Sequence, residues 1–467
     1  YHRIKHQIVT QAMSLVSPIH DVHVYQARRA RVLRWMHDQG GGVAVIPTGE
    51  PSLRNASNPH PFRFDNQFYY LTGFTEPAAW LIMVAHADGS SESILFCQAK
   101  DPNTEIWDGV RWGPEAALVA FGFDQAHSID ALSEWLPKAL VGATTVFAPL
   151  HRAAVADLPM QLQRWITSAR QQTRGTRALP ERWIDLTPLL SRQRLIKDAH
   201  EQTIMRQAAH IAAQGHCEAM RRVQPGQAER SLEAELLRVF LQGGAQGTAY
   251  ETIVATGANA CVLHHRAGHS TIKDGDLILI DAGCELHGYA SDITRTFPAN
   301  GRFTGPQAAL YDIVLAAQAA AVALTRPGES FNAGHEAAVN VLCQGLIDVG
   351  ILKGSLAEAI ETRSYQPFYM HRTGHWLGLD VHDVGPYRLT ELDVEEPDWR
   401  PLEPGMVLTI EPGLYIRPND HVPEPFWNIG IRIEDDALVT EQGCELITRG
   451  VPVERKTIEE LMRAGRC

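Results

Sequence analysis

Apolar and polar residues follow two different periods along the first part of the chain. Residues 25–39 place Val32, Leu33 and Met36 near a helical period, which predicts a helix. Four short apolar runs come next, and each predicts a strand: GGVAVIP, FYYLTGF, AAWLIMVA and ESILFCQ. The region up to about residue 190 therefore predicts a domain of the α/β class.

The pattern changes after Leu195, where residues 201–223 keep a long helical period. The polar and basic stretch TSARQQTRGTRALPERW (167–183) just before it is the natural place for a connection between domains. A chain of 467 residues is also too long for one typical core. We expect a mixed α/β (α+β) protein with an extension at 1–20, a first domain at 21–190 and a second at 191–467. The residues before Met13 show no pattern, and we expect them to be a remnant or a mis-assigned start.

The second domain contains an internal repeat. Pro-Gly pairs at 225–226 and 327–328 each precede a predicted helix, and KDGDLILIDAG (273–283) aligns with EPGMVLTIEPG (403–413). Both segments place a glycine six residues before an acid and another two residues after it. Each half therefore predicts a helix, an acid-bearing strand and a second acid, and the second half carries extra residues around His375.

The spacing of the acids about two predicted turns indicates that they meet in pairs across hairpins. Asp281 and Asp292 lie symmetrically about a plausible four-residue turn at 285–288, so antiparallel pairing would place them opposite each other, about 5 Å apart. Glu411 and Glu434 lie symmetrically about the proline-rich loop near residues 422–423. A lone acid at a strand end is usually a turn cap. Two matched acids in both halves instead predict a cluster of carboxylates, which needs positive charge nearby.

The residue types of this cluster favour metal binding. Four carboxylates with His375 and no paired thiolates suit hard or borderline divalent ions such as Mn²⁺, Co²⁺ or Zn²⁺. Carboxylates that bridge two ions about 3.5–4 Å apart leave room for a shared hydroxide, which can act as a hydrolytic nucleophile. We therefore expect two divalent ions.

Composition limits the partners. With 42 basic and 54 acidic side chains the net charge is -12, which argues against nucleic acid or an anionic membrane and favours cationic ligands such as peptides with a free amino terminus. The seven scattered cysteines include no CxxC pair and predict reduced thiols in a cytoplasmic enzyme. No apolar stretch approaches the roughly 20 residues of a membrane span.

Several motifs together closely resemble the proline-specific branch of the pita-bread metallopeptidases, the aminopeptidase P type. They are FYYLTGF, EIWDGVRWG, LHHRAG, LILIDAGCELHGYASDITRTFP, HRTGHWLGLDVHDVG, LEPGMVLTIEPGLYI and GIRIEDD, and they span nearly the whole chain. The resemblance implies a pseudo-twofold catalytic domain, release of the first residue from peptides with proline second, and a homodimer or homotetramer. Mn²⁺ is the first candidate for the two ions.

The resemblance also implies individual roles. Asp281 would bind one ion, Asp292 and Glu434 would bridge both, and His375 and Glu411 would complete the other site. Glu411 would also move a proton between the attacking water and the leaving proline nitrogen. His264, His371 and His382 would hold the substrate carbonyl and stabilise the oxyanion. Arg432 and Tyr415 would support the metal ligands. Trp107 would form part of the wall of the substrate site.

This chain departs from the family at two places. His371-Arg372-Thr373 stands where the family commonly has His-Gly-Leu, so the family's preference for substrate length does not carry over directly. Gln67 replaces the acid that precedes the aromatic pair in DNQFYY, which weakens any role there in binding the amino terminus. His265 matches no required position and is expected to be incidental.

Other functions use the same motifs. A prolidase, which cleaves Xaa-Pro dipeptides, is the nearest alternative. A methionine aminopeptidase lacks such a first domain, and creatinase-type chemistry works without metal. Non-catalytic pita-bread binding modules typically lose metal ligands, whereas all five are present here.

Overall fold

The computed structural model describes residues 20–150, 155, 157–389 and 398–465. Residues 1–19, which make up nearly all of the expected extension, lie outside this range. Two compact units divide the chain, unit 1 to Ser191 and unit 2 from Arg192 onward. Among the described residues no helix is long and apolar enough to cross a membrane.

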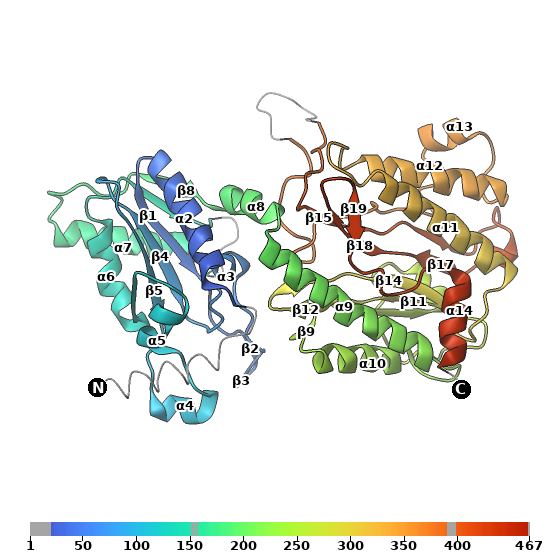
Figure 1. Cartoon of the computed structure of the whole chain (residues 1–467), viewed down its shortest axis with the longest axis horizontal. Coiled ribbons are helices and arrows are strands. Elements are labelled where there is room, and N and C mark those ends of the chain that lie inside the picture. The colour runs from blue at the N-terminus through green and yellow to red at the C-terminus, as the bar shows by residue number, and fades with distance from the viewer. Residues whose placement is uncertain (1–19, 151–154, 156, 390–397, 466–467) are drawn as a thin grey trace. The chain divides into compact units, whose positions relative to one another are not determined.

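Unit 1 is built on a mixed six-stranded sheet in the order β6-β5-β4-β1-β7-β8 (Figure 1). The central strand β1 pairs antiparallel with β4 and parallel with β7, and β1, β4 and β5 are almost wholly buried. Helices pack around the sheet, with Val32 and Met36 of α2 fully buried. The elements are α2 (Val22–Asp38), β1 (Gly42–Pro47), β2 (Leu53–Asn55), β3 (Asn58–Pro59), α3 (Asn66–Thr72), β4 (Trp80–Ala85), β5 (Ser91–Cys97), α4 (Pro102–Asp108), α5 (Gly113–Ala120), β6 (Gln125–Ser128), α6 (Leu132–Leu140), β7 (Thr145–Ala148), α7 (Leu158–Gln172), β8 (Arg182–Asp185) and α8 (Thr187–Leu195).

Two predictions for unit 1 are wrong. FYYLTGF forms most of helix α3, because Asp65 accepts hydrogen bonds from the amides of Gln67 and Phe68 and Gly73 ends the helix at a φ of 67°. Every residue of α3 is buried, so its apolar run has no period that separates helix from strand. The stretch 167–183 does not connect domains either, because it finishes α7 and enters β8 at the edge of the sheet.

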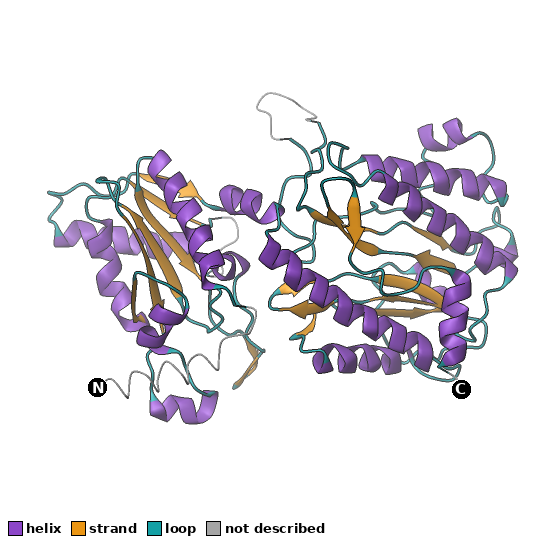
Figure 2. Ribbon diagram, viewed as in Figure 1, coloured by secondary structure: helices purple, strands orange, loops and turns teal. Residues whose placement is uncertain are grey.

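Unit 2 repeats one arrangement twice. Helix α9 packs against α10 beside strands β10, β11 and β14, and α11 packs against α12 beside β15 to β18. Figures 1 and 2 show strands between the green α9–α10 pair and the yellow-to-orange α11–α12 pair. The elements are α9 (Ala199–Arg222), α10 (Glu229–Gln242), β9 (Gly247–Thr248), β10 (Ile253–Thr256), β11 (Leu277–Asp281), β12 (Cys284–Leu286), β13 (Tyr289–Ala290), β14 (Thr294–Pro298), α11 (Gly305–Ala323), α12 (Ala333–Asp348), α13 (Leu356–Glu361), β15 (Val407–Ile410), β16 (Gly413–Ile416), β17 (Ile429–Arg432), β18 (Asp435–Val439), β19 (Cys444–Leu446) and α14 (Arg455–Ala464).

The strand register of the second half agrees with the predicted pairing of Glu411 and Glu434. Ile410 pairs with Asp435 and Gly413 pairs with Arg432, so Glu411 and Glu434 lie opposite each other at the break between the two ladders.

The register of the first half differs from the prediction. Asp281 pairs with Thr294, because the turn consists of two residues, His287 and Gly288, both at positive φ (49° and 80°). Amide hydrogen bonds from Ala282 to Ile293 and from Ser291 to Cys284 place Asp292 opposite Gly283 instead. The second acids therefore do not occupy matching positions in the two halves: the register equivalent of Glu434 is Thr294, and that of Asp292 is Arg432.

The two halves meet at their equivalent residues. Thr294 and Glu434 form an antiparallel bridge, in which the Glu434 amide donates to the Thr294 carbonyl oxygen. This bridge joins the first-half ladder to the second-half ladder, so acids about 140 residues apart in sequence come within reach of one another.

Candidate metal centre and its cavity

All four acids lie where a strand ends or is interrupted. Asp281 ends β11, Asp292 precedes β14, Glu411 falls between β15 and β16, and Glu434 falls between β17 and β18. Asp292 is 5% exposed and Glu434 2%. Side chains at such breaks leave the regular alternation of the strand, so they can turn toward a common point.

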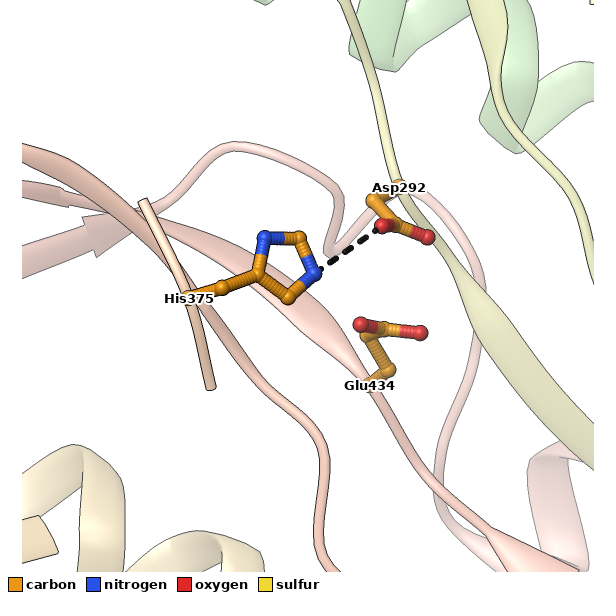
Figure 3. A group of neighbouring side chains, drawn as sticks. All are labelled: Asp292, His375 and Glu434. Carbon is orange, nitrogen blue, oxygen red and sulfur yellow. Dashed lines mark ion pairs between the residues drawn. The ribbon is translucent and has the colours of Figure 1, made fainter. Parts of the chain in front are cut away.

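Three of the predicted ligands form a tight group. Asp292, His375 and Glu434 each offer a ligand atom, and these atoms lie within 4.8 Å of one another (Figure 3). His375 Nε2 lies 3.5 Å from Asp292 Oδ2 and 3.7 Å from Glu411 Oε1. The structure thus brings residues from both halves, together with His375 from the extra segment, to one place.

Tyr250 links the two aspartates of the first half. Its hydroxyl oxygen lies 2.6 Å from Asp281 Oδ1 and 2.5 Å from Asp292 Oδ1. A phenol has one hydrogen, so it can donate to only one of two ionised carboxylates, and the other contact needs a proton or a cation nearby. This geometry fits a site that holds positive charge.

The pKa values of the carboxylates also indicate that the cluster lacks positive charge. Burial, and then repulsion by Asp292 and Glu411, raise the pKa of Glu434 well above its ordinary value. Burial also raises the pKa of Glu411 to about 7, against the opposing influence of His375 and Arg432. The pKa of Asp292 is raised by burial as well, although His375 opposes the shift.

His375 responds in the opposite direction. Burial lowers its pKa, but its contact with Asp292 and the charge of Glu411 more than compensate and raise it to about 9. Without other cations the imidazole therefore keeps a proton beside the carboxylates. A divalent ion would replace that proton, because a metal binds the neutral ring.

Arg432 is the permanent cation in contact with the cluster. Its Nη2 donates to Asp281 Oδ2 at 2.6 Å, its Nε to Thr294 Oγ1 at 3.1 Å, and its Nη1 to the Tyr415 hydroxyl at 2.9 Å. The Thr294 hydroxyl in turn donates to Glu434 Oε2 at 2.6 Å. One guanidinium cannot neutralise four clustered carboxylates, two of them buried, so the donor set fits divalent ions.

A cavity of about 710 Å³ in unit 2 opens onto this cluster, and we call it the metal cavity. The four acids, His375 and Arg432 line it, together with His264, His371 and His382. The His382 ring lies 4.1 Å from the His375 ring, centroid to centroid. The three histidines predicted to act on the substrate are therefore gathered at one cavity.

His371 has both ring nitrogens engaged. Nδ1 lies 2.7 Å from the Arg372 carbonyl oxygen, which can only accept, so Nδ1 carries the hydrogen. Nε2 then accepts from the Tyr415 hydroxyl at 2.8 Å, and burial with the nearby Arg432 lowers the His371 pKa to about 4. Arg432, Tyr415 and neutral His371 form one continuous chain of hydrogen bonds.

The surroundings of Trp107 and His265 are described within their own units. Trp107 is on α4 of unit 1, where its side chain is 85% exposed, so its role at the substrate site stays a prediction. His265, for which no role at the site was expected, makes a structural contact instead: its Nε2 lies 2.9 Å from the fully buried carboxylate of Glu229. That pair ties the segment after β10 to α10.

Sequence reasoning missed Tyr250 and Thr294. Both contact metal-ligand candidates that lie far along the chain. Tyr250 lies in none of the quoted motifs, and Thr294 lies in one of them, two residues after Asp292, where only the acids were considered. The signal that could have found Thr294 was its place in that motif, and for Tyr250 it was the position just before an apolar strand.

Comparison with known proteins identifies the family of the chain and agrees with its fold. Residues 203–441 match the model of metallopeptidase family M24, and residues 25–147 match that of the aminopeptidase P N-terminal domain. The chain belongs to metallopeptidase family M24, and the resemblance and fold class predicted from its motifs are confirmed.

The particular relatives are Xaa-Pro aminopeptidases. The Xaa-Pro aminopeptidase of Escherichia coli is 41% identical over 95% of this chain and 98% of that protein, and human Xaa-Pro aminopeptidase 3 is 33% identical over 94% and 85%. The structure of Pseudomonas aeruginosa aminopeptidase PepP has a TM-score of 0.90 at 45% identity, covering 96% of this chain and 99% of that one. A zinc-substituted E. coli aminopeptidase P in complex with product also has a TM-score of 0.90, at 39% identity and the same coverage.

Proposed function

We propose that this protein is an Xaa-Pro aminopeptidase that uses two divalent metal ions to release the first residue of peptides with proline in second place. The observation that carries the proposal is the convergence of four carboxylates, two of them buried, and His375 on one cavity. Similarity to Xaa-Pro aminopeptidases along nearly the whole chain supports the choice of substrate. Mn²⁺ is our first candidate, with Co²⁺ and Zn²⁺ as alternatives.

The ligand roles follow the arrangement of the acids. We assign Asp281 to one ion, Asp292 and Glu434 to both, and His375 and Glu411 to the other. Asp292 and Glu434 come from different halves and both belong to the tight group, which supports a shared role for them. When bound, the two ions would supply positive charge and a nucleophilic hydroxide at neutral pH.

Glu411 has the properties of a proton carrier. It lies beside His375 in the wall of the metal cavity, where its carboxylate could accept a proton from the attacking water and return it. The proline nitrogen must be protonated as the carbon–nitrogen bond breaks, and Glu411 lies in the wall of the same cavity. We propose that Glu411 delivers this proton.

The histidines divide into two roles. His264 and His382 line the metal cavity, and within the described residues no hydrogen bond to either ring is found, so we propose that they donate to the substrate carbonyl oxygen. The ring of His371 already accepts a hydrogen bond from the Tyr415 hydroxyl. We therefore propose that His371 positions Tyr415 and Arg432, and through them Asp281. Trp107 and a homodimeric or homotetrameric assembly remain proposals drawn from the resemblance, as does a cytoplasmic location.

The decisive experiment is hydrolysis of an Xaa-Pro-Xaa tripeptide with added Mn²⁺. We expect release of the first amino acid, and almost none from the Glu411→Ala variant, whose metal content should be measured in parallel. Equal behaviour of the two proteins would overturn the proposal. An Xaa-Pro dipeptide tests the prolidase alternative, which predicts faster cleavage of the dipeptide than of the tripeptide.

A further inference from the structure

A second cavity of unit 2 adjoins the metal cavity. It has a volume of about 320 Å³, and His371 and Arg372 line both cavities. These two residues therefore form a shared wall. We call the second space the basic cavity, because Arg363, Arg372 and His335 line it together with Tyr365 and Tyr369.

The two cavities differ in the balance of their charged side chains. Acids outnumber arginines at the metal cavity, which is lined by Glu251, Asp281, Asp292, Glu411 and Glu434 and by Arg266, Arg372 and Arg432. Within the part of the chain that the structure describes, no Asp or Glu lines the basic cavity. Burial, and then the charge of Arg372, lower the pKa of His335 to about 4, so His335 is neutral at neutral pH. The positive charge of the basic cavity therefore comes from Arg363 and Arg372.

The Arg372 side chain is held in place. Its guanidinium carbon lies 4.6 Å from the centre of the Trp399 ring, and its Nη2 donates to Asn332 Oδ1. The Asn332 amide nitrogen donates to Glu336 Oε1 at 2.6 Å, which turns the amide oxygen toward the arginine. A guanidinium has five N–H donors, so a fixed one with one hydrogen bond retains donors for a planar anion such as a carboxylate.

We propose that the basic cavity is a subsite for the peptide beyond the proline, and that Arg372 selects a carboxylate one or two residues after it. A peptide rises about 3.3–3.6 Å per residue, so its leaving portion can pass from the metal cavity over the shared wall. The inference rests on the proposed aminopeptidase activity and adds its substrate class, which is peptides acidic after the proline. The protein's overall charge of -12 favours cationic peptides, so a preference for acidic ones would have a local cause.

The test compares three amidated peptides: Ala-Pro-Glu-Glu, Ala-Pro-Ala-Ala and Ala-Pro-Lys-Lys. For the metal-loaded protein we expect kcat/KM to be about tenfold higher with the Glu than with the Lys peptide, mostly through KM. Arg372→Gln should reduce this ratio to about one and leave the Ala peptide within about twofold. Arg372→Lys should restore part of the ratio, because it keeps the charge and loses the planar fork.

Arg388→Gln is the matched control. Arg388 also stacks on Trp399, at 4.1 Å, but does not line either cavity, so its loss should leave the ratio unchanged. A ratio near one in the unmodified protein, a ratio that survives Arg372→Gln, or an equal loss in Arg388→Gln would overturn the inference.

A binding measurement separates this inference from the proposed function. Calorimetric titration of the Glu and Lys peptides into the Glu411→Ala variant reports the subsite without catalysis. If the Ala peptide is not hydrolysed but the Glu peptide binds more tightly in an Arg372-dependent way, the activity fails and the subsite stands. If the Ala peptide is hydrolysed but the Glu and Lys peptides bind equally, only the subsite fails.

Discussion

The two halves of unit 2 share one strand register but place their second acid at different positions in it. In the second half Glu411 faces Glu434 across the hairpin, and in the first half Asp281 faces Thr294 while Asp292 faces Gly283. A repeat of similar strands therefore yields an unequal set of side chains. The second acid lies two residues earlier along its strand in the first half, so the equivalent positions hold Asp292 and Thr294 there and Arg432 and Glu434 in the second half.

The difference has a chemical consequence. If the halves were equivalent, Arg432 would be an acid and Thr294 would be a glutamate, so the centre would hold more negative charge and lose its permanent cation. The observed registers place Arg432 beside Asp281 and let the Thr294 hydroxyl donate to Glu434. The asymmetry thus provides both the ligands and the groups that orient them.

The largest expected effect comes from the pair of register-equivalent residues, Glu434 and Thr294. Glu434→Gln removes a proposed bridging ligand and should lower kcat/KM by about 10³-fold or more, because a metal supplies several kcal/mol of stabilisation. Thr294→Val removes only a hydrogen bond to that ligand and should cost about 10- to 100-fold. Steady-state kinetics and metal analysis of both variants measure these effects. Equal losses of kcat/KM in the two variants would contradict the comparison.

The two glycines after the strand acids should differ in stability. A Cβ at Gly283 would lie 1.6 Å from the Ser291 carbonyl oxygen, whereas one at Gly413 would lie 2.7 Å from the Tyr415 hydroxyl. We expect Gly283→Ala to lower the free energy of unfolding by about 3 kcal/mol and Gly413→Ala by about 1 kcal/mol. Denaturant unfolding of both variants checks the order, and a smaller loss for Gly283→Ala would show that Asp292 does not lie opposite Gly283.

The tyrosines of the two halves should also differ. Tyr250→Phe removes a hydroxyl that touches Asp281 and Asp292 directly and should lower metal affinity about tenfold. Tyr415→Phe acts through Arg432 and should change metal affinity less than Tyr250→Phe does. Titration of the metal-free proteins with Mn²⁺ measures both affinities, and a stronger effect of Tyr415→Phe would reverse the assignment.

The smallest expected effect is the pH dependence of the metal-free protein. In the folded state the pKa of Glu411 rises from 4.5 to about 7 and that of His375 from 6.5 to about 9. The folded protein therefore holds more protons than the unfolded chain, and its stability falls as pH rises between about 4.5 and 9. Bound metal should reverse the trend, because ions replace these protons.

Thermal unfolding across this pH range, with chelator and with Mn²⁺, tests the linkage. A midpoint that rises with pH in the chelated protein would mean that His375 and Glu411 are not protonated as the geometry requires. The replacement His375→Gln should flatten the part of the curve above about pH 6.5.

Much of the catalytic unit could be predicted from its sequence. The glycine-acid-glycine spacing at 275–283 and 405–413 indicated two related strands, and the symmetry of Glu411 and Glu434 gave the correct register because their long loop does not disturb it. The first-half register failed since it depends on whether the turn has four residues or two. Positive φ at His287, a non-glycine residue, carried no clear signal.

Burial explains the other failures. FYYLTGF is apolar on every face, so local pattern could not separate a buried helix from a strand, and contacts with the rest of unit 1 decided. Arg372 was recognised as a departure from the family, but its stacking on Trp399 and its place between two cavities depend on residues far along the chain.

The sequence by itself determined the inventory: four acids at strand ends, one histidine from the extra segment, and the helices that flank them. These features depend on spacing and periodicity, which are local. Only the tertiary structure decided which acids face each other, that Tyr250 joins two of them, and that Glu411 has a pKa of about 7. Those properties depend on burial and on the close approach of distant segments, which set the charge balance of a site that no single stretch of sequence contains.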